Sequence, residues 1–337
     1  MLTDSTLSAE NQAARLADEI DALALRLSQL RRSIGSVIFG QQEVVDQTLI
    51  AILADGHALL VGLPGLAKTR LVETIGAVVG LDTKRVQCTP DLMPADIIGS
   101  EMLDQDEAGK RHFRFVPGPV FAQLFMADEI NRASPRTQSA LLQAMQEHRV
   151  SVAGRYHPLP RPFHVLATQN PIEQEGTYPL PEAQLDRFLL EIRVGYPDLD
   201  AERQMLLATT GPQEDLPGAV MTGAELYAAQ RLVRRLPAGA GVVDMVLSLV
   251  RSARPESATD PALRTAIAWG PGPRASQALL MAARARAVLD GRLAPSPDDV
   301  VALAHPVLRH RMALHYAARA DGLTLEGVID RLLLPYR

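Results

Sequence analysis

The segment from residue 62 to residue 69 has the residue types of a loop that binds phosphate. It runs Gly-Leu-Pro-Gly-Leu-Ala-Lys-Thr and stands between an apolar run and a stretch with helical spacing. Glycines let successive backbone N–H groups face an anion, and the N-terminus of a following helix adds partial positive charge. Lys68 can reach the β- and γ-phosphates of a nucleotide, and Thr69 can ligate Mg²⁺. Because Ala67 replaces the glycine of the usual pattern, an ordinary strand-to-helix turn remains open for this segment alone.

Two adjacent carboxylates, Asp128 and Glu129, follow the apolar run at residues 124–127. Open α/β sheets bind their ligands at the carboxyl ends of the strands. There Asp128 would belong to the Mg²⁺ shell, and Glu129 would polarise an attacking water molecule. An acidic pair that ends a strand is common by itself, but a phosphate loop about sixty residues upstream favours the catalytic interpretation.

A third apolar run, at residues 163–168, leads to Gln169, Asn170 and Pro171. An amide at the end of a neighbouring strand can orient water or contact the γ-phosphate. The Asn-Pro pair is equally typical of a turn. Spacing alone leaves both interpretations open.

Short apolar runs alternate with helical patterns between residues 56 and 194. Runs of this length that do not alternate in polarity are typical of strands buried on both faces of a parallel sheet. After residue 198 the strand pattern ends, and Ala, Leu and Arg at helical spacing dominate. We therefore expect an α/β part followed by an all-α part. The apolar runs lie at residues 57–61, 85–88, 123–127, 163–167 and 188–194.

Three further segments lie outside this alternation. At the N-terminus, a helical stripe favours an amphipathic helix packed on the body of the protein, with a partner-binding helix as the alternative. Two insertions, at about residues 99–116 and 149–160, predict β-hairpins, the first with a turn at Asp106-Glu107-Ala108-Gly109. The stripe consists of Leu16, Ile20, Leu23, Leu27, Leu30 and Ile34.

Charge and composition limit the classes of function. The 34 basic and 39 acidic side chains give a net charge of −5, the wrong sign for a protein whose main partner is a phosphate backbone. The single cysteine, Cys88, cannot form an internal disulfide and fits a reducing compartment. The acidic N-terminus is unlike a signal peptide, and no apolar run approaches the ~18 residues of a membrane helix. We expect a cytoplasmic protein without a membrane span.

Four motifs in order along the chain resemble the MoxR group of AAA+ ATPases. They are the loop at residues 62–69, MADEINRA at 126–133, ATQNP at 167–171 and EGTYPLPEAQLDRF at 175–188. The resemblance includes the alanine before the lysine, and it extends from about residue 37 through the LRHRM and IDRLL segments near the C-terminus.

The resemblance implies a P-loop AAA+ core, with a five-stranded parallel sheet between helices, followed by an all-α lid domain. The expected boundaries are residues 1–34 for the N-terminal helix, 35–198 for the core and 199–337 for the lid. The two hairpins would correspond to the helix-2 insert and the pre-sensor insert of this clade, which face a central pore.

The resemblance also implies roles for single residues. Arg187 would be an arginine finger that reaches the nucleotide of a neighbouring subunit, and Arg274 would be a second sensor on the lid. Asp128 and Glu129 would form the Walker B motif, and Asn170 would be the first sensor. ATP would be the bound nucleotide, and Mg²⁺ would be held by Thr69 and Asp128. The residues implied to bind ATP are Gly62, Pro64, Gly65, Leu66, Ala67, Lys68, Thr69 and Arg70, with Val37 and Ile38 beside adenine.

The function implied by the resemblance is Mg²⁺-dependent ATP hydrolysis by a ring, expected to be a hexamer. Hydrolysis would drive chaperone-like remodelling, assembly or metal insertion of protein partners, with von Willebrand factor A domain proteins as the expected class. The alternative is a nucleic-acid motor related to helicases, which the acidic balance and the 4% aromatic content disfavour. A scaffold that binds ATP but barely hydrolyses it is disfavoured by Glu129 and Arg187. The client, and whether Arg132 or Arg136 acts across a subunit interface, stay open.

Overall fold

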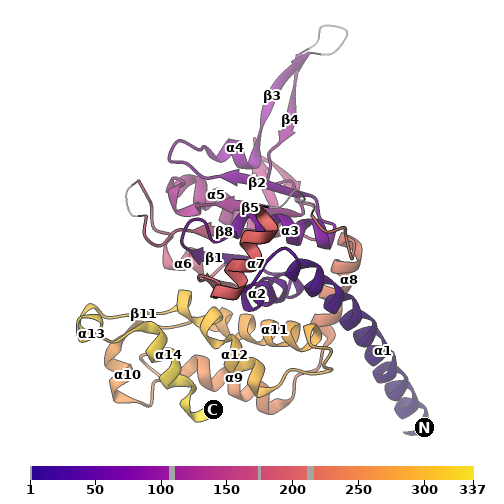
Figure 1. Ribbon diagram of the computed structural model, residues 1–337, viewed down its shortest axis with the longest axis vertical. Helices are drawn as coiled ribbons and strands as arrows, with labels where there is room; N and C mark the ends of the chain where they lie inside the picture. The colour runs from indigo at the N-terminus through magenta and orange to yellow at the C-terminus, as the bar shows by residue number, and fades with distance from the viewer. Residues whose placement is uncertain (1, 106–110, 174–175, 211–215) are drawn as a thin grey trace. The chain divides into compact units, whose positions relative to one another are not determined.

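The computed structural model describes residues 2–105, 111–173, 176–210 and 216–337 (Figure 1). The expected turn at residues 106–109 and Glu175 of the fourth motif lie outside the described residues. Two compact units make up the chain. One is Ile34–Tyr227, and the other combines Met1–Ser33 with Ala228–Arg337.

A five-stranded sheet with the order β2-β5-β8-β1-β9 forms the centre of the first unit. Every pairing in it is parallel, so the carboxyl ends of all five strands lie at one edge. All five residues of β5 are buried, as the unbroken apolar run predicts, whereas the edge strand β2 is partly exposed. The predicted α/β fold with a five-stranded parallel sheet is therefore confirmed. The strands are β1 (Ala58–Gly62), β2 (Thr83–Gln87), β5 (Leu124–Asp128), β8 (His164–Gln169) and β9 (Leu190–Val194).

Helices cover both faces of this sheet. On one face, a Cβ at Gly76 of α3 would lie 3.3 Å from Leu124 Cδ2, so this helix packs closely on β5. On the other face, Leu142 of α5 belongs to the same buried cluster as Phe125. Leu124 and Phe125 are successive residues of one strand and point to opposite faces. The helices of this unit are α2 (Gln42–Leu53), α3 (Lys68–Val79), α4 (Pro94–Ile98), η1 (Ile130–Arg132), α5 (Pro135–Glu147), α6 (Glu182–Leu185) and α7 (Leu199–Thr209), and α8 (Gly223–Arg235) crosses the division.

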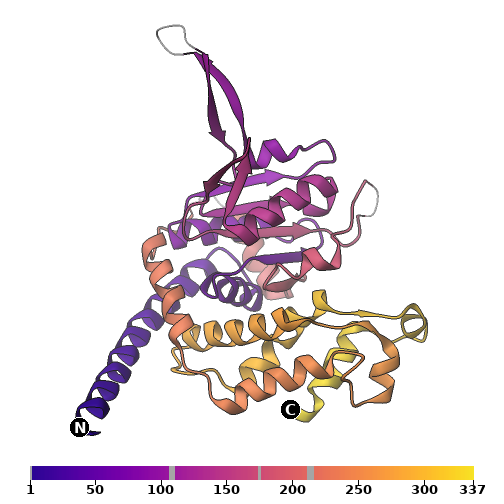
Figure 2. The same cartoon turned by 180° about the vertical axis from the view of Figure 1, so that it is seen from behind.

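Two antiparallel hairpins extend from the α/β unit. Strands β3 (Gly99–Gln105) and β4 (Arg111–Pro117) form the one that projects from the sheet region (Figures 1 and 2). Strands β6 (Arg149–Val152) and β7 (Arg155–Pro158) form the other. The rings of Phe115 in β4 and His157 in β7 stack with centroids 3.8 Å apart, so the two hairpins are in direct contact.

The α/β unit continues past residue 198, where the strand pattern of the sequence ends. Helix α7 packs so tightly that a Cβ at Gly40 would lie 2.3 Å from Ala201 Cβ. Beyond it, the N–H of Val220 donates to the carbonyl of Val78 in α3, at 2.8 Å. The compact unit therefore extends to Tyr227, because these segments fold back onto the sheet.

The second unit is helical and includes the N-terminal helix α1. Ile20, Leu27 and Leu30 of the apolar stripe are almost fully buried, as expected for packing on the body of the protein. None of the helices in the described part of the chain is both long and apolar enough to cross a membrane. The elements here are α1 (Leu2–Gly35), α9 (Ala240–Ser252), α10 (Pro261–Ala266), β10 (Ile267–Trp269), α11 (Pro273–Leu289), α12 (Pro297–Leu308), η2 (Arg309–Arg311), β11 (Ala313–Leu314), α13 (Tyr316–Ala320), α14 (Leu325–Leu333) and η3 (Leu334–Tyr336).

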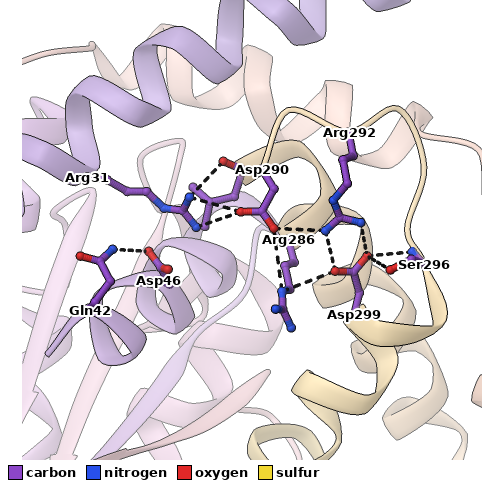
Figure 3. A network of polar contacts seen from close by, with 9 residues as sticks. Arg31, Gln42, Asp46, Arg286, Asp290, Arg292, Ser296 and Asp299 are labelled. Atoms are coloured by element: carbon purple, nitrogen blue, oxygen red, sulfur yellow. Dashed lines mark hydrogen bonds and ion pairs between the residues drawn. The ribbon is translucent and has the colours of Figure 1, made fainter. Parts of the chain in front are cut away.

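A polar network joins α1, the end of α11 and the start of α12 (Figure 3). The carboxylate of Asp299, whose side chain is only 2% exposed, accepts bonds of 2.6 and 2.7 Å from Arg292. It also accepts the N–H of Ser296 at 2.8 Å and caps α12. Arg292 and Arg31 both donate to Asp290, which connects this cap to α1. Burial opposes ionisation of Asp299, but the bonds from Arg292 and Ser296 outweigh it and lower the pKa of this carboxyl.

We expect Asp299→Asn to lower the free energy of unfolding by about 2 kcal/mol at neutral pH, because it removes charge-assisted bonds from a partly exposed arginine. Since the folded state lowers the pKa of Asp299, its stabilisation is complete above about pH 4 and is lost as the pH falls through the folded pKa. Urea unfolding at a series of pH values should show the difference between parent and variant shrinking in acid. Asp298→Asn, which neutralises an exposed neighbour, is the control, and an equal loss there would contradict the prediction.

Candidate active site

The loop between β1 and α3 has close contacts and backbone angles that favour glycine. A Cβ at Gly62 would lie 2.5 Å from the carbonyl oxygen of Val194 in β9, so glycine is needed where the two strands end together. Gly65 and Ala67 have φ values of +80° and +56°. Glycine adopts this left-handed conformation most easily, which explains why the usual pattern has glycine before the lysine, and alanine adds only a methyl group.

Helix α3 begins at Lys68 with its first N–H groups directed at the loop. Ala67, its N-cap residue, has no polar side chain, and the first turn carries no acidic residue. The orphan N–H groups of the first turn are therefore available to an anion. The ammonium of Lys68 donates to the carbonyls of Gly62 and Leu63, the latter at 2.7 Å. Burial lowers the pKa of Lys68, against the opposing effect of Asp128 and Glu129.

Three of the four sequence motifs meet in one cavity at the carboxyl edge of the sheet, which we call the strand-end cavity. Its volume is about 420 Å³. The phosphate loop, the acidic pair and the predicted sensor Asn170 all contribute to its wall, as the topology of a parallel sheet requires. The residues that line it are Pro64, Gly65, Leu66, Ala67, Lys68, Thr69, Arg70, Arg85, Gln87, Asp128, Glu129, Thr168 and Asn170.

A second cavity of about 420 Å³, the side cavity, shares with it the loop from Pro64 to Ala67 and the side chain of Arg70. Val37 and Ile38, which the sequence places beside adenine, line this cavity. The opposite wall is formed by residues around Tyr196 and by α7. Two connected compartments, one rich in charged groups and one lined largely by apolar side chains, suit the phosphates and the base of a nucleotide.

The carboxylate of Asp128 is buried, and both of its oxygens accept hydrogen bonds. Its Oδ2 accepts bonds from Arg85 Nη2 at 2.6 Å and Nε at 3.1 Å, and its Oδ1 accepts the hydroxyl of Thr168 at 2.5 Å. Burying a carboxylate is costly unless such partners hydrogen-bond to it. The pKa of the nearby Cys88 thiol is raised to about 12 by burial and by the charges of Asp128 and Glu129, so this thiol stays protonated.

Sequence reasoning missed Arg85 and Thr168. Both belong to apolar runs that were assigned only as strands, and they meet Asp128 because β2 and β8 are the neighbours of β5. The available signals were the charge of Arg85 within its strand and the hydroxyl of Thr168 at the end of its strand. Their meaning depends on the strand order, which the runs alone do not specify.

Glu129 has a left-handed backbone, with φ +54°, which is uncommon for a residue with a side chain. Its N–H donates to the hydroxyl of Thr168 at 2.8 Å, and its Oε2 accepts Arg132 Nη1 at 3.2 Å. Thr168 therefore bonds to both acidic residues and fixes the turn that presents them. Glu129 is less buried than Asp128 and lines the cavity beside Lys68.

Asn170 fits both of the interpretations that its sequence left open. Its Oδ1 accepts the N–H of Ile172 at 3.2 Å, which makes the turn expected of an Asn-Pro pair. Its Nδ2 donates to Glu173 at 3.4 Å, and the side chain lines the strand-end cavity.

Arg187 and Arg274 are the two remaining predicted residues. Arg187 follows α6 and donates to the carbonyl of Leu142 in α5, and it is not among the described residues that line the strand-end cavity. Arg274 is the second residue of α11, in the helical unit. The roles of both arginines stay predictions.

Comparison with known proteins agrees with this architecture. Residues 57–190 match the model of the ATPase family associated with various cellular activities (AAA), and residues 261–332 match the AAA lid domain. The chain is 43% identical to Chaperone MoxR1 of Mycobacterium tuberculosis, over 95% of this chain and 83% of that protein. It is 33% identical to Protein MoxR of Paracoccus denitrificans, over 90% of this chain and 94% of that protein.

A solved structure shows the same fold over nearly the whole chain. The crystal structure of a candidate ATPase from Cytophaga hutchinsonii superposes with a TM-score of 0.85 and 34% identity, covering 98% of this chain and 97% of the other. The order of the motifs, the two matching domain models and the extent of these alignments all agree. The chain therefore belongs to the MoxR family of AAA+ ATPases, and it is an enzyme that hydrolyses ATP.

Proposed function

We propose that this ATPase hydrolyses Mg²⁺-bound ATP as a ring, and that hydrolysis drives chaperone-like remodelling of protein partners. The observation that carries the proposal is the convergence of Lys68, Asp128, Glu129 and Asn170 on one cavity beside the N-terminus of α3. Phosphoryl transfer requires little covalent chemistry from the protein, because positioning and electrostatic stabilisation supply most of the catalysis. This cavity holds the groups for both.

The loop and α3 would bind the phosphates. Backbone N–H groups from Gly65 to Thr69 lie where a helix start favours negative charge. The ammonium of Lys68 is a compact point charge that can approach the β- and γ-oxygens, which a planar guanidinium would do less well. The adenine would occupy the side cavity, next to Val37 and Ile38.

The residues of the strand-end cavity fit a Mg²⁺ ion. Thr69 and Asp128 supply hydroxyl and carboxylate oxygens, the hard ligands that Mg²⁺ prefers. In the described part of the chain, no group of three or more His, Cys, Asp or Glu side chains could hold a metal alone. Mg²⁺ in such sites is commonly held by one or two protein groups, water and the phosphates of the substrate. When bound, the ion would neutralise charge that develops on the phosphates.

Glu129 would polarise the attacking water. Its Oε2 accepts the bond from Arg132, and the other oxygen of the same carboxylate can accept a hydrogen from water. Asn170, on the neighbouring strand end, would contact the γ-phosphate or orient the same water molecule. The rigid turn at Glu129, held by Thr168, supports this positioning role.

Arg187 would complete the site of a neighbouring subunit. It donates to the carbonyl of Leu142 in α5, and neither residue is among those described that line the strand-end cavity. A catalytic arginine supplied in trans makes hydrolysis depend on assembly, which supports a ring, expected to be a hexamer. Arg274 would sense the nucleotide from the lid.

The partner class is proposed from the resemblance to the MoxR group. One relative is named a chaperone, which supports remodelling as the output of hydrolysis. The MoxR resemblance extends the proposal to von Willebrand factor A domain proteins as clients, and to assembly or metal insertion as the outcome. The single cysteine supports a cytoplasmic location.

Two substitutions separate binding from hydrolysis. Lys68→Ala should abolish nucleotide binding, because it removes the cation that contacts the phosphates. Glu129→Gln should retain ATP binding, lose about 10² to 10⁴ in turnover and accumulate an ATP-bound ring. Equilibrium binding of a fluorescent ATP analogue and steady-state phosphate release measure the two effects. If Glu129→Gln releases phosphate at the parental rate, Glu129 is not the residue that activates water.

Arg187→Ala should bind ATP with parental affinity but lose about 10³ to 10⁵ in turnover within the assembled protein. Mixed assemblies supply the control for action in trans. Subunits carrying Arg187→Ala, mixed with Lys68→Ala subunits that retain Arg187, should regain part of the lost activity. Unchanged turnover of the single variant, or no recovery on mixing, would rule out the trans role.

The partner class can be tested with a purified von Willebrand factor A domain protein encoded beside this gene. We expect Glu129→Gln with ATP to retain it on a column, because the ATP-bound ring is trapped. Lys68→Ala, which should not bind ATP, is the matched control. Retention by neither variant, or equally by both, would contradict a nucleotide-dependent client of this class.

A further inference from the structure

A single turn of helix places an arginine next to the proposed catalytic glutamate. The turn is η1 (Ile130–Arg132), which follows Glu129 directly. From its last residue, Arg132 Nη1 lies 3.2 Å from Glu129 Oε2 and 3.4 Å from Glu173 Oε1. One guanidinium nitrogen thus stands between two carboxylates.

The same contacts lead to the predicted sensor. Glu173 Oε2 accepts a bond from Asn170 Nδ2 at 3.4 Å. Four side chains therefore form a continuous polar chain in the order Glu129, Arg132, Glu173, Asn170. The two ends of this chain line the strand-end cavity, and the two middle members connect them.

Hydrogen bonds from Gln138 hold the backbone of the turn that carries Arg132. Gln138, which is 1% exposed, donates to the carbonyls of Ile130, Ala133 and Tyr178, at 3.0 to 3.2 Å. The N–H of Tyr178 donates in turn to the carbonyl of Asn131 at 2.6 Å. These bonds fix the backbone of η1 relative to the acidic pair.

This arrangement differs from an ordinary surface ion pair. Exposed pairs stabilise little, because two long side chains must lose conformational freedom to meet. Here the backbone on both sides is already fixed, by Gln138 at η1 and by Thr168 at Glu129. Arg132 and its two acidic partners are each about one-third exposed, so the contact sits at the rim of the cavity, where it can orient a side chain without burying it.

We propose that Arg132 is a positioning residue for Glu129, acting within its own chain. The proposal rests on the role of Glu129 suggested above. A donor on Oε2 restricts rotation of the carboxylate, so that Oε1 is presented to the water molecule beside the γ-phosphate. Errors of about 1 Å in the placement of a catalytic group can lower the rate by as much as 10²-fold. Glu173 contacts both Arg132 and Asn170, so it connects the orientation of the Glu129 side chain to that of Asn170.

The test uses the full chain with Arg132→Gln, which removes the charge and the forked donor. We expect kcat to fall by about 10- to 10²-fold, less than for Glu129→Gln, with KM and nucleotide affinity unchanged. Arg132→Lys should restore part of kcat, because it keeps the charge but not the fork. Arg235→Gln, which removes an exposed ion pair with Glu19 in the helical unit, is the control and should retain parental kcat.

A double variant distinguishes positioning from an independent effect. In the Glu129→Gln background, Arg132→Gln should cause no further loss, because the group that it positions is already absent. A full additional loss would overturn the proposal. Recovery of Arg132→Gln activity on mixing with Glu129→Gln subunits, which retain Arg132, would also overturn it, since that result places the arginine in trans.

Glu173→Gln is the second variant, for the case in which Arg132→Gln fails to fold. It leaves Arg132 in place but removes one of its two partners, so we expect a smaller fall in kcat with parental nucleotide binding and parental melting temperature. Parental kcat in this variant and in Arg132→Lys would overturn the proposal. An active Glu129→Gln would overturn both the proposed role of Glu129 and this inference. An inactive Glu129→Gln with a fully active Arg132→Gln would overturn the inference alone.

Discussion

The carboxylate of Asp128 is the group around which the rest of the strand-end cavity is arranged. It is buried at the end of β5, and each neighbouring strand supplies it with a partner, Arg85 from β2 and Thr168 from β8. An ionised carboxylate tolerates such burial only with these bonds. A slip of one residue between the strands would turn the three side chains to different faces of the sheet. The site can therefore form only when the strands pair in this register.

Adjacent carboxylates repel each other, and this chain offsets the repulsion with cations of its own. Arg85 contacts Asp128, Arg132 contacts Glu129, and Lys68 lies near both. A chain with a net charge of −5 thus concentrates positive charge where a polyphosphate would bind. The two arginines come from different elements, Arg85 from the edge strand β2 and Arg132 from the turn η1. Each of the two acidic side chains is therefore oriented by its own arginine.

The parts of the site that depend on local backbone could be predicted from the sequence, and those that depend on strand order could not. The loop at residues 62–69 is recognisable because its left-handed positions and its helix start are local properties. The partnership of Arg85 with Asp128 joins residues far apart in the chain, and only the pairing of β2 with β5 creates it. The extent of the compact α/β unit is likewise beyond what local sequence shows. Secondary structure changes class at residue 198, but the packing of α7 against Gly40 is a tertiary property.

The stacked rings of Phe115 in β4 and His157 in β7 are not among the described residues that line the cavity, but they join the two hairpins. Strand β7, which carries His157, leads within a few residues to β8, and β8 ends at the threonine that bonds to both acidic residues. Packed protein interiors transmit strain because they compress little. A force on the hairpin of β3 and β4 would therefore be transmitted, through its packing on the second hairpin, toward the end of β8, where Thr168 bonds to both acidic residues.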